Sequence, residues 1–182
     1  SFTARNTYYF DAPGPANTRD CARFAAERAE ELGIDMVVVA STSGETAREF
    51  FSALKGTGLS LVVVTHSVGF SEQGIWEFSP EAAAELREGG VRIVTGTHAL
   101  SGLERSFSRS PKVGGGSRTE AVAEALRRVI AVGLKVAIEC VLIAADQGAV
   151  STSREVVACG GTSRGADTVC VIRPSHTASF FD

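Results

Sequence analysis

The sequence predicts an α/β fold in which a mostly parallel five-stranded sheet is covered by helices on both faces. The runs 37–40 (VVVA) and 59–65 (LSLVVVT) are almost continuously apolar, a pattern typical of central parallel strands. Segments with helical spacing of apolar residues separate the strand-like runs, as in βαβ units. The last two runs, 155–159 and 168–173, are too close together for a crossover helix, so we expect them to pair antiparallel at one edge of the sheet.

Length and composition indicate one globular domain that spans residues 1–182. The chain is 44% hydrophobic and carries a formal charge of -3, which gives no general attraction to nucleic acid or to an acidic membrane surface. Its apolar runs are shorter than a membrane span requires, and the first ten residues lack the apolar core of a signal peptide. The expected location is therefore the cytoplasm.

The four cysteines give no sign of a metal or disulfide framework. Cys21, Cys140, Cys159 and Cys170 are scattered and form no C-x-x-C pair. Buried, unreactive thiols are the simpler interpretation.

The first helix is expected to begin at Asn17 or Thr18, after a proline-rich turn over residues 11–15. Apolar residues then recur at three- and four-residue spacing as far as Leu32, and Gly33 is a typical helix stop. The strand that ends at Ala40 follows, and then a helix over residues 47–54.

The next elements are the strand over residues 59–65 and a long loop over residues 66–78, which contains the only tryptophan. Loops of this length in compact domains are often functional. Ser79 is expected to cap a helix over residues 81–88, and a third, shorter strand follows at 91–95.

Residues 96–116 are the least regular part of the chain, with a helical turn or two predicted over 100–107. The segment is locally basic, because Arg105, Arg109, Lys112 and Arg118 meet no acidic residue between Glu104 and Glu120. A solvated loop and an anion-facing loop both fit this pattern. The sequence Ser117 to Glu120 is a capping box that predicts a helix over residues 121–132.

Residues 134–145 (LKVAIECVLIAA) suit either a strand or a buried helix, and we predict a helix from the length and the flanking glycines. Glu139 lies among apolar neighbours, where an unpaired carboxylate would be costly. It is expected to pair with an arginine or to remain partly hydrated, and a structural ion pair is favoured over catalysis.

The turn after the first strand, Ser41 to Thr46 (STSGET), carries the clearest functional signal. It offers hydroxyl groups and free amides at the first turn of a helix, where the helix dipole favours an anion. This predicts a phosphate-binding loop. The alternative is that Ser41 or Ser43 simply caps the helix.

Several stretches resemble a known family. The series VVVASTSGETA, LVVVTH and VVACGGTSRGADTVCVIRP resembles the C-terminal α/β domain of pyruvate kinase. The stretches LSGLERSFSR, GGGSRTEAVAEALR and ECVLIAADQGAVS are more similar to the stand-alone pyruvate kinase C-terminal-domain-like proteins. The resemblance covers nearly the whole chain.

The resemblance implies a three-layer α/β/α fold with strand order 3-2-1-4-5 and an antiparallel fifth strand. It also implies that residues 41–46 match the loop that holds a phosphate of the sugar bisphosphate effector in allosteric pyruvate kinases. Members of the stand-alone family are associated with flavin mononucleotide (FMN), whose phosphate could use the same position. Glu45 departs from the basic residue common in the pyruvate kinase loop, which weakens the sugar bisphosphate hypothesis more than the FMN hypothesis. Pyruvate kinase activity is not expected, because the barrel domain that carries it is absent from this sequence.

With that strand order, a ligand is expected beyond the carboxyl ends of strands 1 and 4, where the order reverses. The candidate phosphate ligands are Ser41, Thr42, Ser43, Gly44 and Thr46, with Arg118 or Arg164 as the charge partner. The rest of the ligand is expected to face Thr65, His66, Gly161, Thr162 and Ser163.

Other candidates are weaker. Trp76 and Phe70 could stack on a flavin, although a role in the core or at an interface is the simpler explanation for each. His66 and His98 could suggest a metal site, but no third ligand stands at a diagnostic spacing, so no metal is predicted.

The leading functional hypothesis is a protein that binds FMN, or another small phosphorylated ligand, and does not bind nucleic acid or membrane. The alternative is a regulatory domain that senses a phosphorylated metabolite without catalysis. A hydrolase or transferase that uses His66 or Glu139 has no support from nucleophile–base spacing in the sequence. Whether the protein is an enzyme stays open, and so does a homo-oligomer, because Phe180 and Phe181 could pack on a neighbouring chain.

Overall fold

In the computed structural model, which describes residues 1–182, five strands form one sheet in the order β3-β2-β1-β4-β5. The strands are β1 (Met36–Ala40), β2 (Ser60–Thr65), β3 (Arg92–Thr95), β4 (Val156–Gly160) and β5 (Thr168–Ile172). β1 pairs in parallel with both β2 and β4, β2 pairs in parallel with β3, and β4 and β5 are antiparallel. The predicted strand order and the antiparallel edge strand are therefore confirmed.

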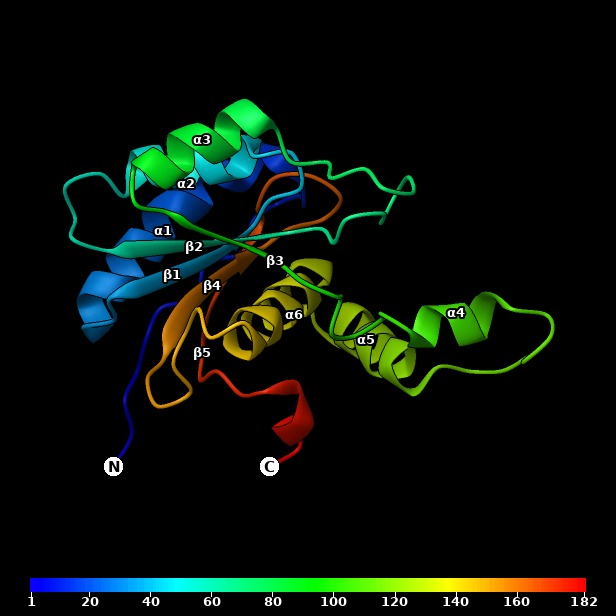
Figure 1. Ribbon diagram of the computed structural model, residues 1–182. Coiled ribbons are helices and arrows are strands. Elements are labelled where there is room, and N and C mark those ends of the chain that lie inside the picture. Colours follow the sequence, from blue (N-terminus) through cyan, green and yellow to red (C-terminus); the bar gives the residue numbers. More distant parts are fainter.

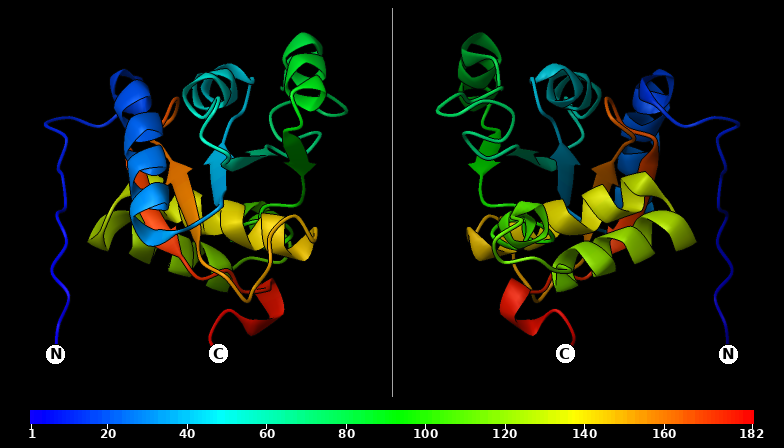
Figure 2. Two further views of the ribbon diagram at one scale, coloured as in Figure 1. Left: turned by 90° about the vertical axis from the view of Figure 1, so that its left-hand side faces the viewer. Right: turned by 90° about the vertical axis from the view of Figure 1, so that its right-hand side faces the viewer.

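Helices cover both faces of the sheet, as Figures 1 and 2 show. One face carries α1 (Thr18–Leu32), α2 (Glu45–Ala53) and α3 (Pro80–Glu88). The other face carries α6 (Val132–Asp146), with α5 (Arg118–Val129) packed beside it and α4 (Glu104–Arg109) next to α5. Two short 3₁₀ helices, η1 (Pro15–Asn17) and η2 (Thr177–Ser179), complete the secondary structure.

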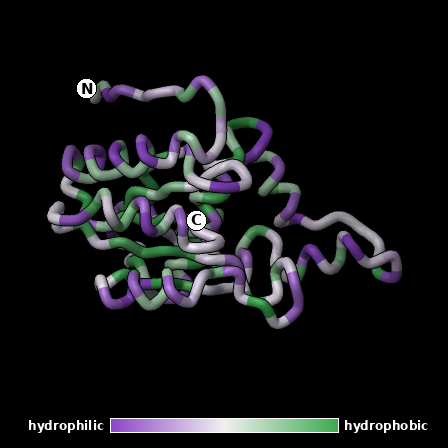
Figure 3. The backbone as a smooth tube through the Cα atoms, turned by 90° about the horizontal axis from the view of Figure 1, so that it is seen from above, coloured by the Kyte–Doolittle hydropathy of each residue, from purple (hydrophilic) through white to green (hydrophobic).

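The strands divide their apolar side chains between two cores. In β1, Val37 and Val39 pack with α1, α2 and α3, whereas Val38 packs with α6, and β2 and β4 alternate in the same way. This division follows from the two-residue period of a strand, and it explains why the runs are apolar throughout. Figure 3 shows these hydrophobic strand segments between the helices.

The ambiguous segment 134–145 forms most of α6, so the helix prediction is confirmed. The preceding helix, α5, ends at Val129 and not at Val132. The backbone turns extended at Ala131, with φ −163° and ψ 151°, and α6 begins at the next residue.

Only half of the predicted capping box forms. The Ser117 hydroxyl accepts a hydrogen bond from the Glu120 amide at 3.0 Å, as expected. The Glu120 carboxylate does not return to the start of the helix. It instead accepts from the Ser108 hydroxyl and lies 3.9 Å from Arg105, so it ties α4 to α5.

α4 and the loop that joins it to α5 extend away from the sheet, which is visible in Figures 1 and 3. The remaining helices pack against the sheet or against α6. None of the helices combines the length and apolar character that a membrane span requires.

Candidate functional site

A crevice of about 650 Å³ lies beyond the carboxyl ends of β1, β2 and β4. Its walls come from the turn after β1, the end of β2 with part of the following loop, the turn after β4, and one face of α6. It contains the point between β1 and β4 where the strand order reverses, which is where open parallel sheets bind ligands. Its volume falls within the roughly 300–1,000 Å³ range of small-molecule sites.

Most of the residues proposed from the sequence line this crevice. Those that do are Ser41, Thr42, Ser43, Thr46, Thr65, His66, Gly161, Ser163 and Arg164. Gly44, Thr162 and Arg118 do not reach its surface. The structure thus brings together three segments that are far apart in the sequence.

The Ser41 side chain already occupies part of the predicted phosphate-binding loop. It is buried, and its hydroxyl accepts hydrogen bonds from the amides of Gly44 at 3.1 Å and Ala47 at 3.3 Å. The amides of Glu45 and Thr46 have no acceptor within the chain. Ser41 therefore caps α2, as the alternative hypothesis expected, and the first two helical amides remain without an acceptor. Phosphate binding at this turn stays a prediction.

Gly44 has a structural role in the turn. Its φ of 104° is strained for any residue with a side chain, and an added Cβ would lie 2.6 Å from the Ala82 Cβ. The turn and α3 are also joined by a hydrogen bond from the Ser79 amide to the Ser43 carbonyl at 3.0 Å. Gly44 lets α2 begin directly against α3.

The turn after β4 is fixed by Asp167, for which no sequence pattern indicated a role. Its carboxylate accepts from the Thr162 amide at 3.0 Å and from the Gly14 amide at 2.9 Å. Ser163 takes a left-handed conformation with φ 67° within this turn. The turn is thereby anchored to the segment that precedes α1.

Arg164 is better placed than Arg118 to neutralise an anion in the crevice. Its side chain lines the crevice, is exposed, and forms no ion pair or hydrogen bond within the chain. Arg118 is the first residue of α5, where its amide donates to Glu104 at 2.8 Å. The sequence left these two arginines as alternatives, and the geometry favours Arg164.

α6 supplies a buried ion pair at the crevice wall. Lys135 and Glu139 are in direct contact, and their side chains are only 4% and 6% exposed. Glu139 also accepts from the Leu100 amide at 2.8 Å and lies 3.6 Å from His98 Nδ1. The partner of Glu139 is therefore a lysine and not the arginine we expected. The i,i+4 spacing of Lys135 and Glu139 within an apolar helix could have predicted this contact from the sequence.

The surroundings of Glu139 keep it ionised. Burial alone would raise its pKa, but the hydrogen bond with His98, the charge and hydrogen bond of Lys135 and the Leu100 amide together lower the pKa to about 2. His98 Nε2 is buried without a hydrogen-bond partner.

α6 also gives the crevice an apolar wall. Val132, Val136, Cys140 and Ile143 line the crevice, and their three- and four-residue spacing places them along one face of the helix. α6 can pack this close to the sheet because Gly160 has no side chain, since a Cβ there would lie 2.3 Å from the Gly133 carbonyl oxygen.

The loop between β2 and α3 contributes His66, Phe70 and Glu77 to the crevice. His66 Nδ1 lies 3.0 Å from Glu77 Oε2, and its ring centroid lies 4.1 Å from that of Phe70. Phe70 in turn stacks on His98 at 4.6 Å. Of the two predicted stacking residues, Phe70 thus lines the crevice.

Trp76 has a different place. It stacks on Phe78, packs against the core on the α1 side, and donates from Nε1 to the Thr65 hydroxyl at 3.0 Å. Glu77, next to Trp76, carried no sequence signal, because it lies in a loop whose path the sequence does not reveal.

All four cysteines are free, and burial raises the pKa of each thiol. The pKa is about 12 for Cys21, Cys140 and Cys170. This agrees with the interpretation of these cysteines as unreactive.

Comparison with known families gives a match to the family described as pyruvate kinase, alpha/beta domain, over residues 19–172. The chain belongs to this family. The matched region contains every strand of the sheet and all of the crevice segments.

Solved structures similar to this chain include two of a pyruvate kinase from Cryptosporidium parvum. One is 15% identical, with a TM-score of 0.47, and the match covers 89% of this chain and 23% of that one. The other, a complex with ADP, is 16% identical, with a TM-score of 0.46, and the match covers 90% and 25% of the two chains. This member of the family thus spans about a quarter of the length of those enzymes.

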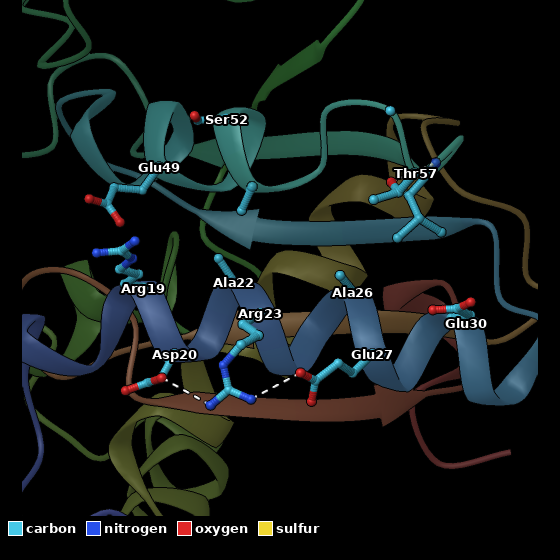
Figure 4. Close-up of a pocket in the computed structure, with 13 residues that line it drawn as sticks. Arg19, Asp20, Ala22, Arg23, Ala26, Glu27, Glu30, Glu49, Ser52 and Thr57 are labelled. Carbon is cyan, nitrogen blue, oxygen red and sulfur yellow. Dashed lines mark hydrogen bonds and ion pairs between the residues drawn. The ribbon is translucent and has the colours of Figure 1, made fainter.

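A larger hollow of about 910 Å³ runs between α1 and α2, from the first turn of α1 and the middle of α2 to the segment before β2 (Figure 4). Three of its charged side chains pair with one another, since Arg23 lies 3.0 Å from Asp20 and 2.9 Å from Glu27. These ion pairs are exposed, and exposed ion pairs contribute little to the stability of the fold. We therefore place the candidate site at the carboxyl edge. No group of three or more potential metal-binding side chains occurs in the chain.

Proposed function

We propose that this protein binds a phosphorylated ligand with a planar apolar group, of which FMN is the leading example, in the crevice at the carboxyl edge of the sheet. The observation that carries the proposal is the two-sided character of the crevice. One side has hydroxyl groups, the open amides of Glu45 and Thr46, and the unpaired Arg164. The other side has the apolar face of α6 and the ring of Phe70.

Each part of the ligand would find a suitable environment. A phosphate is stabilised by helix-start amides and by a guanidinium group. A flat aromatic ring system is stabilised by apolar contacts with Val132, Val136 and Phe70. No reaction is assigned to such a ligand, and a cytoplasmic location is part of the same proposal.

A sugar bisphosphate suits the crevice less well. Glu45 and Glu77 line it and would repel a second phosphate. The alternative role, sensing a phosphorylated metabolite, is supported by Arg164 and by Arg105 and Arg127 along the same walls, of which the last two also pair with Glu120 and Glu124.

The test is a thermal-melting and fluorescence titration with FMN. Binding to the folded state must raise the melting temperature. The variant Arg164→Ala is expected to raise Kd roughly 10- to 100-fold, because a hydrogen bond to a charged group contributes about 1.5–3 kcal/mol.

Two arginines provide matched controls. Arg118→Ala and Arg154→Ala should leave Kd unchanged, since neither side chain lines the crevice and Arg154 pairs with Asp35 ahead of β1. If FMN gives no shift but a sugar phosphate or nucleotide does, the sensing role replaces the flavin proposal. If none of them gives a shift, both proposals fail.

A further inference from the structure

A hydroxyl, an imidazole and a carboxylate are in successive contact in the crevice wall. Thr42 Oγ1 lies 3.5 Å from His66 Nε2, and His66 Nδ1 lies 3.0 Å from Glu77 Oε2. All three side chains line the crevice, and Thr42 and His66 are partly buried. This is the order of groups found in nucleophile–base–acid relays, and apo structures often hold the nucleophile at a slightly long distance.

The sheet itself sets the first contact. In the parallel pairing of β1 with β2, Ala40 is opposite Val64. Thr42 and His66 each follow two residues later, so both leave their strands at the same height.

Glu77 is held in place by its neighbours in the loop. Trp76 donates to Thr65 at 3.0 Å, and the Ser79 amide donates to the Ser43 carbonyl at 3.0 Å. These bonds fix the loop on both sides of Glu77 against the ends of β2 and of the turn after β1. The carboxylate therefore reaches His66 from a fixed position.

The Glu77 carboxylate also favours the His66 tautomer that can act as a base towards Thr42. The hydrogen bond with His66 lowers the pKa of Glu77, so the carboxylate is ionised at neutral pH. It then accepts a hydrogen bond from Nδ1–H of His66. Nε2 is then left with a lone pair that faces the Thr42 hydroxyl. An imidazole in this tautomer can take the hydroxyl proton.

The same turn offers donors for a developing negative charge. The amide of Ser43, which follows Thr42, has no acceptor within the chain, and neither do the amides of Glu45 and Thr46. Amides at a helix start stabilise an oxyanion when it forms next to the nucleophile.

We propose that Thr42 is a nucleophile for acyl transfer from activated carboxylic esters, with His66 as its general base and Glu77 as a positioning residue. Thr42 Oγ1 attacks the carbonyl carbon while His66 Nε2 takes the hydroxyl proton. The bond to the leaving alcohol then breaks, and the alcohol receives that proton. In the second half, water attacks the acyl-threonine while His66 takes a proton from the water. The carboxylic acid is then released, and Thr42 Oγ1 recovers a proton from His66. This activity does not depend on the FMN proposal.

The experiment uses p-nitrophenyl acetate as the probe, with the release of nitrophenol and the intact mass of the protein as readouts. The expected result is one acetyl group on Thr42, located by peptide mass spectrometry. Thr42→Val removes this adduct, and Thr42→Ser retains it. His66→Asn lowers the acetylation rate about 100-fold or more, in line with the 10²- to 10⁴-fold effect of a general base.

Glu77 is tested by a pair of variants. Glu77→Gln is expected to lower kcat with little change in KM, and Glu77→Asp to restore part of the rate. A purely structural role for Glu77 would lower the melting temperature without this difference between the two variants.

The chain contains a matched control for the background reactivity of a surface imidazole. His176 Nδ1 lies 3.2 Å from Asp146, but no hydroxyl lies at its Nε2. His176→Asn should leave the rate unchanged. Equal rates of nitrophenol release by the wild type and Thr42→Val, or equal rates for the wild type and His66→Asn in folded protein, would overturn the proposal.

Discussion

The hydroxyl of Ser41 lies 3.3 Å from the amide of Ala47 and caps α2 from the buried side of the turn. The same oxygen accepts from Gly44, so a single side chain satisfies two amides at the start of this helix. Part of the turn that we propose as a phosphate site is therefore occupied by the protein itself, and an anion there could use only the amides that Ser41 leaves open.

Replacing Ser41 by alanine should destabilise the protein. The change removes a buried acceptor from two amides, and loss of a helix cap costs about 0.5–2 kcal/mol. Urea unfolding measures the difference. Ser43→Ala is the matched control, because the exposed Ser43 hydroxyl forms no hydrogen bond within the chain, and it should change stability by less than about 0.5 kcal/mol. Equal effects of the two changes would contradict the capping role.

Replacing Glu139 by glutamine should destabilise the protein strongly at neutral pH. The change leaves the Lys135 ammonium buried without its counter-charge, and breaking a buried ion pair costs roughly 3–5 kcal/mol. The double variant Lys135→Met with Glu139→Leu is the control, since replacement of both charges by apolar groups is often neutral or stabilising. If the double variant is the less stable of the two, burial of charge is not the cause.

The same carboxylate should make stability depend on pH in the acid range. Its pKa is lowered from 4.5 in the unfolded chain to about 2 in the folded protein. The stabilisation is therefore complete above the unfolded pKa and is lost as the pH falls from about 4.5 to about 2. Urea unfolding across this range should show a steeper acid decline for the wild type than for Glu139→Gln, and parallel curves would exclude Glu139 as the source.

Replacing Gly44 by valine should destabilise the fold. An added Cβ would lie 2.6 Å from the Ala82 Cβ, and the φ of 104° is unfavourable for any residue with a side chain. A substitution that does not suit the backbone conformation destabilises the protein by more than about 1 kcal/mol. Ligand binding is therefore better tested at Arg164 than at Gly44. Gly116→Ala is the control, because a Cβ at Gly116 meets nothing within 4 Å, and melting temperatures should separate the two variants clearly.

The thiols should react slowly with a disulfide reagent in the folded protein. Burial raises the pKa of Cys21, Cys140 and Cys170 to about 12, so little thiolate is present at pH 8. Cys170 is the least buried and should react first. The absorbance of the released reagent should correspond to all four thiols after denaturation. If the folded Cys170→Ser variant still reacts rapidly, another cysteine is accessible.

The elements of the fold could be predicted almost completely from the sequence, because their signals are local, whereas the strand order was expected from the resemblance to a known family. The apolar strand runs, the helix stops and the short connection before β5 each depend on neighbouring residues. The predicted end of α5 differs from the observed end by three residues, because no glycine or proline marks the break between Val129 and Val132.

The site was predictable only in part. The position of the crevice follows from strand order, so Ser41, His66 and Ser163 could be placed there together. Asp167 and Glu77 could not, since their partners are distant in sequence and are reached through loops. The choice between Arg118 and Arg164 likewise depends on where α5 begins relative to the crevice.

The alignment of Ala40 with Val64 makes the spacing of Thr42 and His66 a property of the whole β1–β2 pair. A shift of β2 by one residue would move its end by about 3.3 Å and turn the next side chain to the opposite face of the sheet. Core valines such as Val62 and Val63 do not line the crevice, but their packing helps to fix the distance between Thr42 and His66. Selection for a fixed distance at the crevice would therefore fall on apolar residues of the core as well as on the polar residues at its edge.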